Sequence, residues 1–242
     1  MLDDMRDLRA AVAGYRTAAT AAGLAWPVPA ESPAGQPPEL VYRLFGVDRV
    51  PEQLAWLTSQ GMHEHRLLPN GGWVEAWPTG GEPLDLLSLS IGTPFPWRQQ
   101  MPLFHFEYIF YTFVLAGEHE GEIWRYELPP DTLDLAVRAA PSAAALFTEW
   151  TRGIAAGVVA HDRTNGWLQV GGGSASVGRL LERDLDPLAF PVSLVDEPLV
   201  RMRQRECGVD MARVELAHGD EGFDCFEELS DIVQATRASL GV

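Results

Sequence analysis

The chain contains no lysine, so its only strongly basic side chains are eighteen arginines, set against thirty-four Asp and Glu residues. The formal net charge at pH 7 is −16. Proteins that bind nucleic acids or anionic membranes contact phosphates through a basic surface, so this balance argues against both classes of partner. A phosphate-binding P-loop requires a lysine in its motif and is excluded.

Cysteine and long apolar runs are also scarce. The two cysteines, Cys207 and Cys225, form neither a disulfide framework nor a zinc-binding pattern, which indicates reduced thiols in a cytoplasmic protein. No apolar run approaches the ~20 residues of a membrane-spanning helix. The first residues, MLDDMRD, are acidic and are not followed by an apolar segment, so we expect no signal peptide.

Recognisable catalytic motifs are missing as well. The glycine-rich stretch 171–176 lacks the residues of a nucleotide-binding loop, and no dinucleotide fingerprint or nucleophile elbow occurs. The feature most typical of an enzyme is His63-x-His65, which on a strand would present two imidazoles to one metal ion, with Glu75 on a paired strand. Two surface histidines on a hairpin are the simpler interpretation. We therefore expect no cofactor, and keep a small-molecule or metal-dependent enzyme with His63, His65 and His105 as ligands as an alternative.

Aromatic residues are abundant between 104 and 115. This nearly unbroken apolar run predicts a central strand covered on both faces. The polar segment 116–121, with glycines near both ends, predicts a turn, and 122–128 predicts a return strand. Alternation along that return strand places Trp124 in the core and Arg125 towards solvent. Further on, Ser142 is expected to cap a helix whose Leu146 and Trp150 face the sheet.

The remaining segments predict a chain in three parts. Apolar spacing predicts a helix over 3–22, and the proline-rich stretch 24–38 predicts a linker. We therefore divide the chain into a helix-and-linker appendage (1–37), a core (38–173) and a C-terminal α/β extension (174–242). The appended helix is expected either to pack on the core or to bind a partner. The other predicted elements are two short helices within 39–60, separated at Gly46, a hairpin of strands 63–68 and 73–77, strands over 84–91, 133–138, 167–170 and 212–217, and helices over 198–206 and 226–240.

Acidic residues are concentrated in two segments. Residues 118–134 contain six carboxylates and one arginine, and residues 206–231 contain nine and one. Acidic surfaces commonly serve solubility alone. The more specific interpretation is a docking surface for a basic protein, because complementary charge accelerates and orients association.

Three motifs in order resemble the SUKH superfamily of Smi/Knr-type and Syd-like proteins. The resemblance spans roughly residues 38–170 and leaves the first helix and the last segment outside. It is carried by helical motifs PELVYRLFG (38–46) and PEQLAW (51–56), by the strand–turn–strand segments YTFVLAG (111–117) and GEIWRY (121–126), and by the helix entry APSAAALFTEW (140–150).

The resemblance implies an α+β fold with a curved, largely antiparallel sheet and helices packed on one side. It also implies a non-enzymatic, immunity-type protein that neutralises a toxin, possibly a nuclease, by direct binding; a structural or signalling adaptor is the alternative. Combined with the charge pattern, it predicts a basic, toxin-like protein as the partner. The predicted contact residues are Glu118, His119, Glu120 and Glu122 in the turn and Asp220, Glu221, Asp224, Glu227 and Glu228 in the tail.

Overall fold

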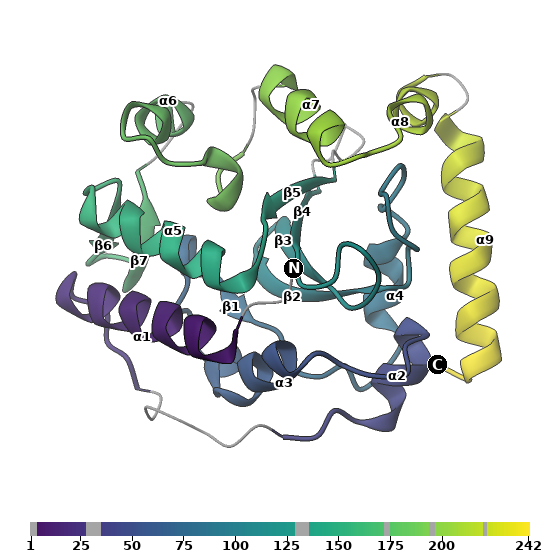
Figure 1. Cartoon of the computed structure of the whole chain (residues 1–242), viewed down its shortest axis with the longest axis horizontal. Helices are drawn as coiled ribbons and strands as arrows, with labels where there is room; N and C mark the ends of the chain where they lie inside the picture. Colours follow the sequence, from purple (N-terminus) through teal and green to yellow (C-terminus); the bar gives the residue numbers. More distant parts are fainter. Residues whose placement is uncertain (1–3, 28–34, 129–135, 172–174, 194–196, 220–221) are drawn as a thin grey trace.

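The computed structural model describes residues 4–27, 35–128, 136–171, 175–193, 197–219 and 222–242, and its centre is an antiparallel sheet (Figure 1). The five strands lie in chain order, so each pairs with its sequence neighbours. A separate two-stranded hairpin lies beside this sheet. These elements confirm the α+β class. The sheet contains β1 (Trp73–Val74), β2 (Gln100–Phe106), β3 (Ile109–Val114), β4 (Ile123–Glu127) and β5 (Val137–Ala140); the hairpin contains β6 (Val159–Asp162) and β7 (Trp167–Val170).

The aromatic run forms two strands, β2 and β3, where the sequence predicts one. The chain reverses at Glu107, whose backbone φ is +61°, and Phe106 then pairs with Ile109. Every residue of β3 is buried: Tyr111 joins the core on one face and Phe110 joins a second cluster on the other. The expectation of a strand covered on both faces is therefore confirmed for β3.

The first face of the sheet carries α5 (Ala143–Ala155) with α1 (Met5–Ala21) beside it (Figure 1). Ser142 caps α5 as predicted, because its Oγ accepts a hydrogen bond from the amide of Ala145 at 3.2 Å. Trp150 is fully buried in this layer, and its ring contacts that of Tyr15 from α1. Tyr15 is also fully buried and donates a hydrogen bond to Leu67 O at 2.8 Å. The first helix is thus part of the core and not an appendage.

The second face is covered too, so the helices are not confined to one side of the sheet. Trp124 and Tyr126 of β4 pack there with Phe95 and with Val214 of α8 (Met211–His218). Cys207, which follows α7 (Glu197–Glu206), joins the same cluster. This second layer combines residues of the C-terminal segment with Phe95 and with Leu86 of the segment before β2.

The return strand β4 is buried along nearly its whole length, so the prediction of a half-solvated strand is wrong. Arg125, predicted to face solvent, is only 1% exposed. Its guanidinium donates hydrogen bonds to Phe190 O at 3.0 Å and Val192 O at 2.9 Å, and to Glu127 Oε2 at 3.1 Å. The segment around η3 (Pro187–Ala189) lies over this strand and buries it.

The two short helices α2 (Glu39–Phe45) and α3 (Glu52–Ser59) form as predicted, with Gly46 left-handed at φ +61°. The predicted hairpin after them is wrong: 3₁₀ turns occupy η1 (Met62–Glu64) and η2 (Pro69–Gly71), and only β1 is strand. Asn70 is used differently from a hairpin turn residue. Its Oδ1 accepts from Val170 N at 2.8 Å and its Nδ2 donates to Pro191 O at 2.6 Å, so it fastens η2 to β7.

Two other predicted strands are helices. Residues 84–91 contribute to α4 (Glu82–Leu87), where Leu84 and Leu87, three positions apart, are both buried. Residues 212–217 lie in α8, which Asp210 caps by accepting from the amides of Ala212 and Arg213. Short apolar runs do not distinguish a strand from a helix, and the helical spacing decides here. The C-terminal segment contains α6 (Ala175–Glu182), α7, α8 and α9 (Gly222–Leu240) but, among its described residues, no strand.

The three predicted parts of the chain share one hydrophobic cluster. Leu8 from the first part, Trp150 from the second and Val233 from the third all belong to it. No helix within the described ranges has the length and apolar character needed to cross a membrane.

Candidate functional site

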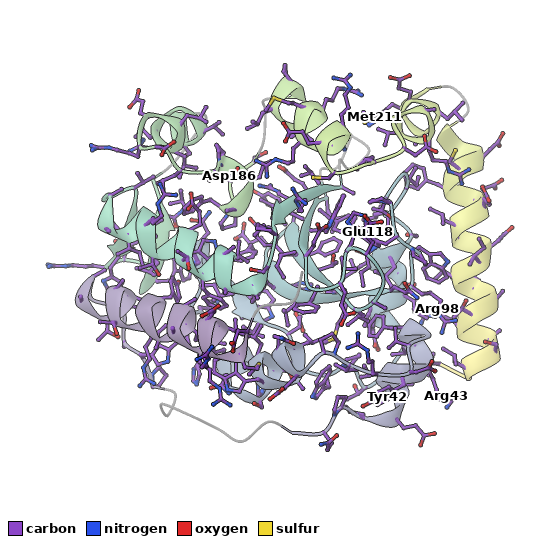
Figure 2. The ribbon with its side chains drawn as sticks, in the orientation of Figure 1. Tyr42, Arg43, Arg98, Glu118, Asp186 and Met211 are labelled. Carbon is purple, nitrogen blue, oxygen red and sulfur yellow. The ribbon has the colours of Figure 1, made fainter. Side chains whose placement is uncertain are left out.

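The turn between β3 and β4 presents fewer acidic groups than the sequence predicts. Glu118 is exposed (Figure 2). The Glu120 side chain is 14% exposed and accepts a hydrogen bond from Arg49 Nη2 at 2.5 Å. Glu122 is 7% exposed and points inward. Of the three acids proposed as contacts in this turn, only Glu118 has a side chain open to a partner.

Glu122 is the centre of a buried polar network. Its Oε2 lies 2.9 Å from His119 Nδ1 and accepts a hydrogen bond from Trp124 Nε1, also at 2.9 Å. Its Oε1 accepts a hydrogen bond from Arg138 Nη1 at 2.8 Å. Burial alone would raise the pKa of Glu122, but the hydrogen bonds from Trp124, Arg138 and His119 lower it overall. Glu122 and His119 therefore hold the turn on the sheet.

The tail acids are better placed for contact. Asp224 and Glu227 are exposed on α9, as is Asp231 one turn later, and Glu228 forms an ion pair with Arg213 of α8 at 2.6 Å. Asp220 and Glu221, the other two predicted contacts, lie outside the described residues. We call Asp224, Glu227, Glu228 and Asp231 the α9 acidic face.

Helix α9 forms one side of the molecule, running from α8 to α2 (Figure 1). It buries Cys225, Leu229 and Val233. Near its C-terminal end Arg237 forms an ion pair with Asp85 of α4 at 2.6 Å. These contacts fix one face of α9 and leave the acidic face in solvent.

Exposed apolar side chains occur on helices α8 and α9. Leu216 of α8 is 45% exposed and Ile232 of α9 is 38% exposed. Single exposed apolar residues are ordinary on a protein surface. Beside acidic side chains, however, they provide the apolar contact area that a protein partner would bury.

The three histidines of the metal-site alternative are not brought together. His63 lies in η1 and is exposed, His65 follows it with an extended backbone, and His105 lies on β2. Within the described ranges, no three His, Cys, Asp or Glu residues are arranged to hold a metal ion. The premise of a His63–His65 strand paired with Glu75 therefore fails.

His105 has a different environment from the other two. Its ring stacks on Trp73 and Phe110, and its Nε2 lies 3.5 Å from Glu75 Oε1. Burial lowers the pKa of His105, and the nearby charge of Glu75 opposes this only in part. The imidazole is therefore neutral at pH 7.

Among the residues that the structure describes, side chains line a groove and a smaller cavity, both open to the surface. A groove of about 460 Å³ lies among α5, η3 and α7, and its charged groups form ion pairs: Arg152 with Glu149 at 2.6 Å and Arg203 with Asp186 at 2.9 Å. A second cavity of about 330 Å³ lies between α4 and β2 and includes His105 and Glu75 in its wall. Because the charges in the first groove are paired with one another, they would attract a charged ligand only weakly.

The sequence did not predict the polar network around Glu122, the burial of Arg125 or the cavity between α4 and β2. The alternation of β4 predicts an outward Arg125, and nothing in the local pattern shows that residues 187–192 cover it. The cavity depends on α4, which the sequence predicts to be a strand. A cluster of Trp77, Pro78 and Pro83 around a sheet edge is the only signal that could have indicated it.

Comparison of the chain with models of known protein families, with curated proteins and with solved structures gives no match.

Proposed function

We propose that this chain is a non-enzymatic protein-binding module that captures a basic protein partner through the α9 acidic face. The observation that supports this most strongly is the arrangement of Asp224, Glu227, Glu228 and Asp231 on the solvent side of one helix whose opposite face is buried. Within the described part of the chain, only Glu228 of these four forms an ion pair. The face therefore carries a net negative charge available to an incoming cationic surface.

The electrostatics favour fast association more than high affinity. Exposed charges at the edge of an interface mainly raise the association rate and make it dependent on salt. The affinity would come from apolar contact at Leu216 of α8 and Ile232 of α9, both of which are exposed. The exposed Glu118 in the β3–β4 turn is a second, weaker candidate contact, whereas Glu120 and Glu122 have intramolecular roles.

The class of partner rests on the resemblance to the SUKH superfamily. That resemblance suggests an immunity-type protein that occludes a toxin, and a nuclease toxin presents a basic surface because it grips phosphates. An acidic face of this kind would compete with the nucleic acid for that surface. Occlusion requires no catalytic group on this chain, in line with the proposed non-enzymatic role in the cytoplasm.

The experiment is affinity capture from the native cell with two charge-matched variants. In the first, Asp224, Glu227 and Asp231 are changed to arginine. In the second, the exposed carboxylates Glu39, Glu52 and Glu182 on other helices are changed to arginine, so the net charge changes equally. We expect wild type and the second variant to retain one basic protein in a 1:1 complex that high salt weakens, and the first variant to lose it.

Equal capture by both variants would contradict the assignment of the α9 acidic face. With the captured partner purified, the association rate should fall most for the α9 variant, and its dependence on ionic strength should weaken. A toxin-like reading frame next to this one would support the immunity role independently.

A further inference from the structure

The cavity between α4 and β2 arises where the sheet loses its edge strand. The β1–β2 pairing ends just after Val74, and the last backbone bond joins Glu75 N to Leu103 O at 2.7 Å. Residues 76–79 then lead from β1 to α4, whose Leu86 lines the same cavity as Met101 and Pro102 of β2. Three separate segments therefore enclose about 330 Å³, within the size range of small-ligand sites.

The wall combines an apolar surface with a few polar groups. The polar groups are Glu75, Glu82 and His105, together with Thr79. A mostly apolar, concave wall with a small number of convergent polar side chains is typical of sites that bind organic ligands. The apolar part of the wall is made by Trp77, Pro78, Pro83, Leu86, Met101 and Pro102.

The charged side chains in the wall of this cavity are all acidic. It contains two carboxylates, Glu75 and Glu82, and no arginine. Trp73 Nε1 donates a hydrogen bond to Glu75 Oε1 at 2.9 Å, which orients that carboxylate beside His105. The imidazole is neutral at pH 7 and does not compensate the negative charge. Asp85, also on α4, is neutralised by Arg237 of α9 and is not part of this wall.

We propose that this cavity binds an organic cation that carries a primary amine or guanidinium group on a short carbon chain. The cationic head pairs with Glu75 and Glu82, since ionised hydrogen bonds are the strongest recognition available to these groups. The carbon chain lies against Met101 and Trp77, and the indole adds a favourable contact with the positive charge. This site is separate from the α9 acidic face, so the inference goes beyond the proposed function.

The same chemistry has two possible sources: a free small amine or guanidine, and an arginine or lysine side chain of another protein. Isothermal titration calorimetry on the full chain distinguishes them with three probes. These are n-butylguanidinium, its neutral counterpart butyramide, and a blocked peptide with one arginine between glycines. We expect n-butylguanidinium to bind with a Kd on the order of 1 mM or below, and butyramide to bind at least about tenfold more weakly.

Single changes in the wall test the assignment. Glu75→Gln and Glu82→Gln should each weaken n-butylguanidinium binding about tenfold, because each removes one charge-assisted contact. Glu215→Gln, on the exposed side of α8, is the matched control and should leave binding unchanged. Glu82 is exposed, so its variant is expected to fold normally and keeps the test informative if the Glu75 variant does not.

Preferential binding of the peptide would identify a protein side chain as the ligand, and preferential binding of n-butylguanidinium a free cation; both support the proposal. It is overturned if butyramide binds as tightly as the cation, if neither cationic probe binds, or if both glutamine variants bind like wild type. The variant with arginine at 224, 227 and 231 should retain cation binding. Failure of this site and failure of the α9 acidic face therefore give different results.

Discussion

Glu122, in the turn just before β4, and Arg138 of β5 form a partly buried ion pair of 2.8 Å between Oε1 and Nη1. The second carboxylate oxygen accepts hydrogen bonds in the turn and on β4, so one side chain links β4, β5 and the turn that precedes β4. An acidic residue in a segment rich in charge thus stabilises the fold. Glu122 is buried, whereas Glu118, four positions earlier, is exposed to solvent.

We predict that Glu122→Ala lowers the free energy of unfolding by about 1–3 kcal/mol, because it leaves the partly buried Arg138 and His119 without their acceptor. Urea unfolding followed by circular dichroism measures this difference. Glu118→Ala is the matched control from the same turn and should change stability by less than about 0.5 kcal/mol. A loss of similar size in both variants would show that the network is not what stabilises the turn.

The network also predicts a dependence of stability on pH. The pKa of Glu122 in the folded protein is below its ordinary value of 4.5. A carboxyl group with a lowered folded-state pKa stabilises the protein above pH 4.5, and this contribution disappears as the pH falls through the folded-state pKa. The stability difference between wild type and Glu122→Gln should therefore be present above pH 4.5 and shrink as the pH falls below it. A difference that grew on acidification would contradict this sign.

Arg125 supports a different prediction, because it connects the sheet to the segment 187–192. Arg125→Met should lower the free energy of unfolding by about 3 kcal/mol, since Phe190 O and Val192 O lose a buried donor. Arg125→Lys should be less harmful but not neutral, because an ammonium group lacks the planar fork that reaches both carbonyls. Urea unfolding gives the free energies, and hydrogen exchange should show faster exchange around 188–192 in both variants. Arg183→Met, at an exposed position, is the control.

The role of α1 is tested through Tyr15. Tyr15→Phe removes the hydrogen bond to Leu67 O and should cost about 1 kcal/mol, whereas Tyr15→Ala also leaves a cavity beside Trp150 and should cost about 3–5 kcal/mol. Thermal and urea unfolding of both variants measure these losses. If α1 were a removable appendage, neither variant would change the main unfolding transition.

The sequence predicted the structure correctly where neighbouring residues alone determine it, as at the ends of helices. Ser142 at the start of α5 and Gly46 after α2 have roles that local chemistry determines, and the structure confirms both. The prediction of α1 as a helix was also correct. Its position was not, because the proline-rich segment after it says nothing about where Tyr15 packs.

Failures occurred where distant segments decide the outcome. Arg125 alternates like a surface residue, and only the chain 65 positions later buries it. Asn70-Gly71 has the composition of a hairpin turn, yet Asn70 bonds to β7 a hundred residues away. The charge pattern predicts Asp224 and Glu227 as contact residues; both are exposed in the structure, and their contact with a partner stays a prediction. The α4 cavity requires three segments whose proximity no local pattern encodes.

Two helix glycines with different surroundings give the final prediction. An added Cβ at Gly14 in α1 would meet no atom within 4 Å, whereas at Gly153 in α5 it would lie 2.7 Å from Phe190 Cε1 and 2.9 Å from Val159 Cγ2. Alanine is favoured over glycine in a helix, so Gly14→Ala should raise the free energy of unfolding by about 0.5–1 kcal/mol. Gly153→Ala gains the same helix propensity but forces Phe190 and Val159 apart in a packed core, so it should be destabilising by about 1–3 kcal/mol overall. Urea unfolding of the two variants should therefore give changes of opposite sign, and a stabilising Gly153→Ala would mean that α5 does not pack against Phe190 this closely.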